Sequence, residues 1–203
     1  MRRKKVFIVL LVLSLVAVLA CAPGAEKTEL PANFVTYTYP EEFSLSFPND
    51  WELDYRFEAP TTELAKKMAA NPTVQPIDLI QTVLYGGLPG GPDYEPVVTV
   101  SIVPRFDRFF TLDEIYETDK KMFTEEVPEY RENSVEWTTV DGREATIIDS
   151  QDNQSEDGER RYLILTTPAG SLVWYVVCSV AIDDYPEWED TFEHVVSSLM
   201  ILQ

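Results

Sequence analysis

The stretch LVWYVVCSVA, residues 172–181, is apolar at nearly every position. Successive side chains of a β-strand point to opposite faces of the sheet, so a strand that is apolar throughout buries both of its faces. We therefore expect these residues to form a central strand of a sheet that is covered on both sides.

Stretches in which apolar and polar residues alternate lie on the N-terminal side of this segment. They predict its neighbouring strands. Asp141-Gly142 is a strong signal for a hairpin between two of them. The predicted strands are residues 135–140, 144–149 and 161–167, with the other turns at 151–159 and 168–170. Short turns between successive strands indicate an antiparallel arrangement.

Alternation also marks the region closer to the N-terminus. Residues 43–47 and 51–57 place apolar side chains at every second position, and Pro48-Asn49-Asp50 between them predicts a hairpin. Further strands are expected at 77–85 and 97–103, and a short helix at 62–70.

Two more helices are predicted from their end signals. The first begins at Thr111, because Thr111 and Glu114 have capping-box spacing and Phe110 with Ile115 occupy the hydrophobic-staple positions. The second follows Asp184 as its cap. The residues expected on its buried stripe are Trp188, Phe192, Val195, Val196 and Leu199. An antiparallel sheet flanked by helices is an α+β fold, arranged as a sandwich.

The first residues match a secretory signal peptide. A basic block at residues 2–5 precedes an apolar run at 6–20, which is shorter than the ~20 residues of a bilayer-spanning helix. The run ends Val-Leu-Ala-Cys21, which resembles the bacterial lipobox, whose cysteine is acylated and becomes the new N-terminus. The alternative is an uncleaved anchor helix with an accidental cysteine at its end.

This resemblance defines the expected organisation of the chain. We predict a lipoprotein signal peptide at residues 1–20, a lipidated Cys21 with a flexible tether at 21–33, and a single domain at 34–203. Two or more acyl chains would anchor the protein stably to the membrane. Lipidation of Cys21 would leave Cys178 without a disulfide partner.

The charge of the chain limits what it can bind. The formal net charge is −19, and removal of the four basic residues of the signal leaves 12 basic against 35 acidic residues, a net charge of −23. Such a surface repels nucleic-acid phosphates and anionic lipid headgroups. We therefore exclude nucleic acid as a partner and expect the acyl chains alone to hold the protein at the membrane.

Two segments resemble the PsbP-like family. Residues 39–51, YPEEFSLSFPNDW, are similar to the family's opening hairpin, and the ending with Tyr185, Trp188, Phe192 and SSLMI at 197–201 is similar to its last helix. The resemblance implies an α/β/α sandwich around an antiparallel sheet, in proteins that act by binding partners. A metal-linked histidine of the family's photosystem members cannot be carried over, because the only histidine is His194.

A surface with both aromatic and basic residues is the first candidate for binding a partner. Phenylalanine and arginine are interleaved after the predicted strand at 97–103, and a glycine-rich loop precedes that strand. These residue types are enriched at interfaces, and mobile loops often carry function. The candidate residues are Arg105, Phe106, Arg108, Phe109, Gly86, Gly87, Gly90 and Gly91.

Two further residues stand out by their position. Asp119 projects into the apolar stripe of the helix that starts at Thr111, where a carboxylate needs a partner. It is therefore either bonded to a Tyr, Trp or Arg at the edge of the sheet, or the acid that contacts a ligand. His194, with Asp190, Ser197 and Ser198 nearby, suggests a catalytic triad, but its position on the last helix predicts a solvated surface side chain.

Acidic residues are abundant in the chain, and carboxylates are the usual protein ligands of calcium. The turn at 151–159 fails the EF-hand pattern, and no Cys/His cluster fits zinc. We expect no cofactor, with calcium as the alternative. The candidate calcium ligands are Asp152, Glu156, Asp157, Asp183 and Asp184.

Together these features predict a function in the cell envelope. We expect an extracytoplasmic, membrane-anchored lipoprotein that acts as a non-catalytic binding or accessory module for an envelope protein complex. The alternatives are a small-ligand or calcium-binding lipoprotein and, as the third hypothesis, an acid-base enzyme. An enzyme of that type would need two buried acids facing one cleft, and the sequence offers only Asp119.

Overall fold

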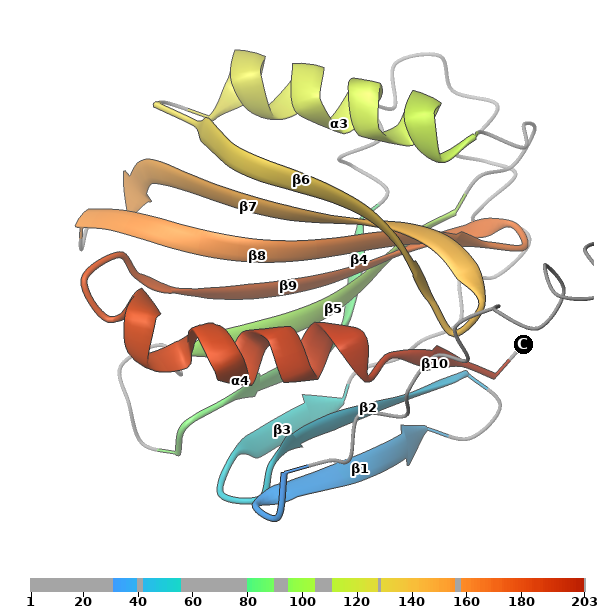
Figure 1. The fold of residues 1–203 in the computed structure, drawn as a ribbon, viewed down its shortest axis with the longest axis vertical. Coiled ribbons are helices and arrows are strands. Elements are labelled where there is room, and N and C mark those ends of the chain that lie inside the picture. The colour runs from blue at the N-terminus through green and yellow to red at the C-terminus, as the bar shows by residue number, and fades with distance from the viewer. Residues whose placement is uncertain are drawn as a thin grey trace, which may run out of the picture. The chain divides into compact units, whose positions relative to one another are not determined.

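Two antiparallel sheets and two helices make up the part of the chain that the computed structural model describes (Figure 1). The described residues are 31–39, 42–55, 80–89, 95–104, 111–127, 129–155 and 158–202. By its internal contacts the chain divides into Met1–Pro31 and Ala32–Gln203, and every described element belongs to the second unit.

The bounds of the elements follow the chain order. They are β1 (Phe34–Tyr39), β2 (Phe43–Pro48), β3 (Glu52–Tyr55), β4 (Gln81–Gly87), β5 (Val97–Pro104), α3 (Leu112–Glu126), β6 (Arg131–Val140), β7 (Arg143–Ser155), β8 (Gly158–Ala169), β9 (Leu172–Ala181), α4 (Tyr185–Ser197) and β10 (Met200–Ile201). The large sheet has the order β3-β4-β5-β9-β8-β7-β6, and the small sheet has the order β1-β2-β10.

Strand β9 lies in the middle of the large sheet, between β5 and β8. Trp174, Val176 and Cys178 are fully buried on one of its faces, while Val173 and Tyr175 pack on the other. The prediction of a central strand covered on both sides is confirmed. We call the face that carries Trp174 the apolar face and the face that carries Tyr175 the polar face.

Helix α4 and the small sheet cover the apolar face. The helix contacts β9, β8 and β2, and its Phe192 and Val195 are fully buried in the main core. From the small sheet, the Phe43 ring meets the Trp174 ring edge-on, with 5.3 Å between ring centroids. Each large apolar side chain buried in this way contributes about 1.5–3 kcal/mol.

Helix α3 covers the polar face over β7 (Figure 1). The predicted capping box is present: the Glu114 N–H donates to Thr111 Oγ1 at 3.3 Å, and the Thr111 N–H donates to Glu114 Oε2 at 3.0 Å. Leu112 and Ile115 form a small apolar cluster with Val173 of β9. Layers on both faces of an antiparallel sheet confirm the predicted α+β class.

The predicted hairpin between residues 43–47 and 51–57 is wrong. Strand β2 pairs with β1 and β10 in the small sheet, whereas β3 pairs with β4 in the large sheet. The turn after Pro48 therefore carries the chain from one sheet to the other. Alternation shows that each segment has one buried face, but it does not show which strand lies beside it. Strands β1 and β10 were not predicted from the sequence.

The hairpin at Asp141-Gly142 is confirmed. Both residues have positive φ, at 52° and 73°, as a two-residue turn between twisted strands requires. The turn predicted at 151–159 is too long, because β7 extends to Ser155 and β8 begins at Gly158. Asp152 therefore lies in a strand.

The start of α4 differs in detail from the prediction. Asp184 occupies the N-cap position, but its side chain makes no capping hydrogen bond. Tyr185 is buried with Phe192, Val195, Val196 and Leu199, whereas Trp188 is only partly buried. No helix within the described ranges has the length and apolar character needed to cross a membrane. The predicted helix at 62–70 and the staple residue Phe110 lie outside the described residues.

Candidate functional site

Buried polar side chains gather on the polar face beneath α3. Thr146 and Ser150 of β7 point to this face and are 1% and 0% exposed. Strand pairing places Trp137 of β6 opposite Thr146 and Glu132 opposite Ser150. These two cross-strand pairs, with Val135 opposite Ile148 between them, form a strip, which we call the β6–β7 strip.

Glu132 is the centre of the hydrogen bonds that join α3 to this strip. The Tyr116 hydroxyl donates to Glu132 Oε1 at 2.9 Å, and the Lys120 ammonium donates to the same oxygen at 3.0 Å. Lys120 also donates to the Tyr116 hydroxyl at 2.9 Å. The bonds to Tyr116 and then to Glu132 raise the pKa of Lys120 well above its usual value, so this lysine stays charged.

Several polar atoms of this region have no hydrogen-bond partner among the described residues. They are Tyr130 Oη, Glu132 Oε2, Thr146 Oγ1 and Ser150 Oγ. Burial raises the pKa of Tyr130, and the nearby Ser150 hydroxyl offsets part of that rise, although the two groups do not reach hydrogen-bond geometry. Each unsatisfied buried group costs about 1–3 kcal/mol, so the arrangement is unfavourable for folding alone.

An exposed aromatic side chain lies at the outer edge of the strip. Trp137 is 50% exposed on β6, which ends the large sheet as described. The Tyr116 ring meets the indole edge-on, with 5.5 Å between ring centroids. Tyr116 therefore connects the exposed indole to the Glu132 carboxylate.

Asp119 lies on α3, half-buried, facing β9. The Tyr175 hydroxyl donates to Asp119 Oδ2 at 3.0 Å. This is the geometry of the first alternative for Asp119, a carboxylate bonded to a tyrosine. A role in ligand contact stays a prediction.

Gly86 and Gly87 lie in β4 rather than in the predicted loop. They pair with Leu53 and Glu52 of β3. A Cβ at Gly86 would come within 2.7 Å of Leu53 Cδ2, so the glycine allows the two strands to pack closely. Their inclusion in a mobile partner surface is corrected, because both residues are buried in the sheet.

Other predicted site residues lie outside the described residues. They are Cys21, Gly90, Gly91, Arg105, Phe106, Arg108, Phe109, Glu156 and Asp157. Lipidation of Cys21 and the aromatic-basic partner surface therefore stay predictions.

The remaining candidate calcium ligands, Asp152, Asp183 and Asp184, lie in different parts of the structure. Asp152 is buried and accepts a hydrogen bond from the Tyr162 hydroxyl at 3.2 Å. Asp183 and Asp184 are exposed in the turn before α4. Within the described ranges, no group of three or more His, Cys, Asp or Glu side chains is placed to hold a metal ion.

His194 is not arranged as part of a triad. Its Nδ1 lies 2.7 Å from the backbone oxygen of Asp190, and Ser197 Oγ donates to the backbone oxygen of His194. The imidazole packs against Phe34 with 5.7 Å between ring centroids. The side chain is thus half-buried rather than fully solvated as predicted, and its contacts join α4 to β1.

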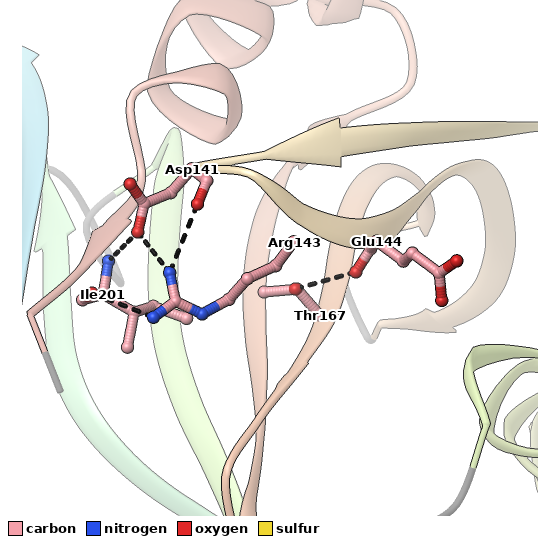
Figure 2. A network of polar contacts seen from close by, with 5 residues as sticks. All are labelled: Asp141, Arg143, Glu144, Thr167 and Ile201. Atoms are coloured by element: carbon pink, nitrogen blue, oxygen red, sulfur yellow. Dashed lines mark hydrogen bonds and ion pairs between the residues drawn. The ribbon is translucent and has the colours of Figure 1, made fainter.

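A second network of polar contacts connects the two sheets (Figure 2). Asp141 accepts a hydrogen bond from the Ile201 N–H at 3.1 Å and forms an ion pair with Arg143. Arg143 also donates to the Ile201 backbone oxygen at 3.4 Å. The side chains at the β6–β7 hairpin therefore hold β10, and with it the end of the small sheet.

Comparison with known proteins identifies solved structures that have a similar fold. No family model and no curated protein matches this sequence. Among solved structures, the chain is similar to cyanobacterial PsbP (CyanoP) from Synechocystis sp. PCC 6803, with a TM-score of 0.56 and 14% identity over 88% of this chain and 98% of that chain. The fold is PsbP-like. LpqN of Mycobacterium tuberculosis, described as involved in cell envelope biogenesis, has a TM-score of 0.52 and 12% identity over 83% of this chain and 90% of that one.

This likeness supports the PsbP-like architecture that the sequence suggested. The cluster around Glu132 was not predicted from the sequence, although Tyr116 and Lys120 are four residues apart and so share one side of a helix. The partner strand β6 could not be aligned with them from the sequence. A bulge between Glu132 and Ser134 shifts the register, and with it the face on which Glu132 lies.

Proposed function

We propose that this protein is an extracytoplasmic lipoprotein, anchored through acyl chains on Cys21, that serves as a non-catalytic binding module for an envelope protein complex. The observation that carries the proposal is the combination of a lipobox-type signal ending at Cys21 with a PsbP-like fold. CyanoP and LpqN share that fold, and the printed description of LpqN names the cell envelope as its setting.

The contacts of the candidate catalytic groups support a non-catalytic role. Asp119 accepts from Tyr175, and His194 contacts backbone oxygen rather than a carboxylate. Both groups bind neighbouring elements of the fold, which is what structural side chains do.

The test is a cross-linked pull-down of the full-length protein from its native membrane, beside a Cys21→Ala variant. A Lys27→Ala variant in the predicted tether serves as the matched control, since it leaves the lipobox intact. We expect one stoichiometric protein partner with wild type and Lys27→Ala, and its loss with Cys21→Ala. Mass spectrometry of the N-terminus reports lipidation in the same samples.

Two results would overturn the proposal. An N-terminus without acyl chains would remove the anchor, and repeated absence of a stoichiometric partner from the lipidated protein would remove the accessory role. If a partner is found, Arg105→Glu and Phe106→Ala test whether the predicted aromatic-basic surface binds it.

A further inference from the structure

We infer that β6 is a site of self-association, at which two copies of this chain pair their β6 strands antiparallel about a two-fold axis at Trp137. This contact joins two copies of the chain and is therefore distinct from the proposed envelope partner. Three features of β6 support it: its exposed edge, the direction of its backbone groups and the residues that face each other when it pairs with itself.

Strand β6 is the longest edge strand in the described part of the chain. It has ten residues, compared with six in β1, four in β3 and two in β10. Natural proteins protect edge strands with lysine, proline, bulges or short length, because unpaired backbone groups bind another strand. The segment SVEWTTV, residues 134–140, has neither lysine nor proline, and the bulge of β6 lies before it. The exposed side chains of this segment are those of Ser134, Glu136, Trp137 and Thr139.

The turn at Asp141-Gly142 determines which backbone groups of β6 point toward β7. Val140 and Arg143 flank this two-residue turn, so they form a hydrogen-bonded pair. Hydrogen-bonded and non-hydrogen-bonded pairs alternate along antiparallel strands. The backbone groups of Val140, Thr138 and Glu136 are therefore used by β7.

The residues between these direct their backbone groups away from β7. Thr139 lies opposite Glu144 in a non-hydrogen-bonded pair. The Glu144 backbone oxygen accordingly accepts a hydrogen bond from Thr167 of β8, on the other side of β7 (Figure 2). By the same alternation, the outward N–H and C=O groups of β6 are those of Val135, Trp137 and Thr139.

Pairing about Trp137 brings these outward groups together. In that register Trp137 lies opposite Trp137 of the second copy, and Val135 lies opposite Thr139. Each outward N–H and C=O group of the three residues then has a backbone partner. Glu136 lies opposite Thr138, whereas a register centred on Glu136 would place two carboxylates directly opposite each other, which is destabilising.

The exposed indole supplies the apolar contact of this interface. Trp137 is 50% exposed, and the Tyr116 ring meets it edge-on, with 5.5 Å between ring centroids. Pairing places the two indoles side by side on the polar face, with a Tyr116 ring on the far side of each. Tryptophan and tyrosine are enriched among the residues that dominate binding energy at interfaces, so this row of rings is the expected anchor of the dimer.

One charge pair opposes the dimer. The two Glu136 side chains are diagonal neighbours in this register, about 7–8 Å apart. Both are exposed, so salt screens their repulsion. Removing this charge should therefore strengthen the dimer, whereas removing the indole should weaken it.

The experiment is sedimentation velocity of the full-length protein in detergent, over a concentration series with micelles in excess. The interface is small, so we expect wild type to dimerise with a dissociation constant on the order of 10–100 µM. Trp137→Ala should weaken dimerisation about tenfold or more, and Glu136→Gln should strengthen it. Tyr85→Ala is the matched control, because Tyr85 is an exposed aromatic residue (41%) on another strand of the same sheet, and it should dimerise like wild type.

Thr139→Pro tests the backbone pairing. Proline removes the outward N–H of this position and none of the hydrogen bonds to β7, and such edge positions tolerate proline. Thr139→Ala is the matched control, because it shortens the same side chain and keeps the N–H. We expect Thr139→Pro to abolish dimerisation and Thr139→Ala to retain it, with circular dichroism of each variant verifying the fold.

Single cysteines test the register. A mixture of Val135→Cys and Thr139→Cys copies would bring two Cα atoms to about 5.5 Å across the pair, within the range of a disulfide. Two copies of either variant alone would hold their cysteines roughly 14 Å apart. Under oxidising conditions the mixture should form a cross-linked dimer and neither variant alone should do so. Wild type, which keeps Cys21 and Cys178, reports background cross-linking.

Three results would overturn the proposal. The first is a wild-type protein that stays monomeric at concentrations about tenfold above the expected dissociation constant. If a partner from the native membrane then protects β6 amides from hydrogen exchange, the edge binds that partner instead of a second copy. The second is a folded Thr139→Pro variant that dimerises like wild type. The third is a cysteine mixture that cross-links no more than either variant alone.

Discussion

The apolar and polar faces of the large sheet are covered by different means. On the apolar face, α4 and the small sheet bury Trp174, Val176 and Cys178 completely. On the polar face, α3 covers Thr146 and Ser150, whose hydroxyls lack described partners. The apolar face contributes mainly hydrophobic stability, although the buried indole N–H of Trp174 has no described partner. More of the unsatisfied groups, which reduce stability, gather on the polar face.

The two faces of the sheet contribute differently to the stability of the fold. Buried apolar surface stabilises without regard to direction, so the apolar face can hold the sheet, α4 and the small sheet together. Unsatisfied polar groups persist only when the rest of the structure supplies enough stability. The polar face therefore contributes less to the stability of the fold than the apolar face.

The largest expected effect is on the apolar face. Trp174→Ala should lower the free energy of unfolding by about 3–5 kcal/mol, because it leaves a large cavity beside Phe43. Tyr175→Phe, the adjacent residue on the polar face, should cost about 1 kcal/mol for the lost bond to Asp119. Denaturant unfolding measures both, and similar losses would show that the two faces do not differ in stability.

A smaller effect on stability is expected at Asp141, whose contacts connect the two sheets. Asp141→Gly keeps the positive φ of 52° without strain but loses the bonds to Ile201 and Arg143. It should lower the free energy of unfolding by about 1–2 kcal/mol.

Asp141→Asn is the control for this change, because asparagine tolerates positive φ and keeps an acceptor for the Ile201 N–H. It should lose less than Asp141→Gly. Equal losses would assign the effect to the ion pair with Arg143 alone.

On the polar face a substitution should stabilise the protein. Thr146→Val keeps the shape of the side chain and removes an unsatisfied hydroxyl, so the free energy of unfolding should rise by about 1 kcal/mol. Thr167→Val is the control, because the Thr167 hydroxyl donates to the Glu144 backbone oxygen at 2.9 Å (Figure 2). It should destabilise, and a loss in Thr146→Val as well would mean that Thr146 has a partner.

The smallest effect concerns alkaline pH. Burial, followed by the charges of Tyr37 and Tyr55, raises the pKa of Tyr39 from 10.0 to about 12. The native state thus favours the neutral phenol, so this contribution to stability is complete below pH 10 and is lost as the pH rises to about 12.

Tyr39 is only partly buried, so its ionisation accounts for only a small part of the free energy of unfolding. Comparing wild type with Tyr39→Phe in denaturant unfolding across that pH window isolates it. The difference between the two proteins should change with pH, and a constant difference would contradict the shifted pKa.

Local features of the fold could be predicted well. The capping box at Thr111 and Glu114 and the turn at Asp141-Gly142 depend on neighbouring residues, so the sequence contains all the information needed. The central position of β9 could be predicted for a similar reason, because each of its faces is apolar. Asp119 can also be identified from the sequence, because its carboxylate interrupts an apolar stripe.

Pairings between distant segments could not be predicted in this way. The alternating residues of β2 and β3 suggested one hairpin, but the two strands belong to different sheets. The polar cluster around Glu132 could not be predicted for the same reason, since it depends on α3 lying over β7 and on the register that places Glu132 opposite Ser150.

The sequence by itself determined the α+β class, the central strand and the acidic charge. Lipidation at Cys21 stays a prediction from the sequence. Only the tertiary structure decided which strands share a sheet, how Asp119 and His194 are bonded, and where unsatisfied polar atoms gather. The physical reason is that caps, turns and amphipathic periods are set by residues close in sequence. Sheet register and helix docking depend on contacts between residues far apart, and a shift of one residue moves every side chain of a strand to the other face.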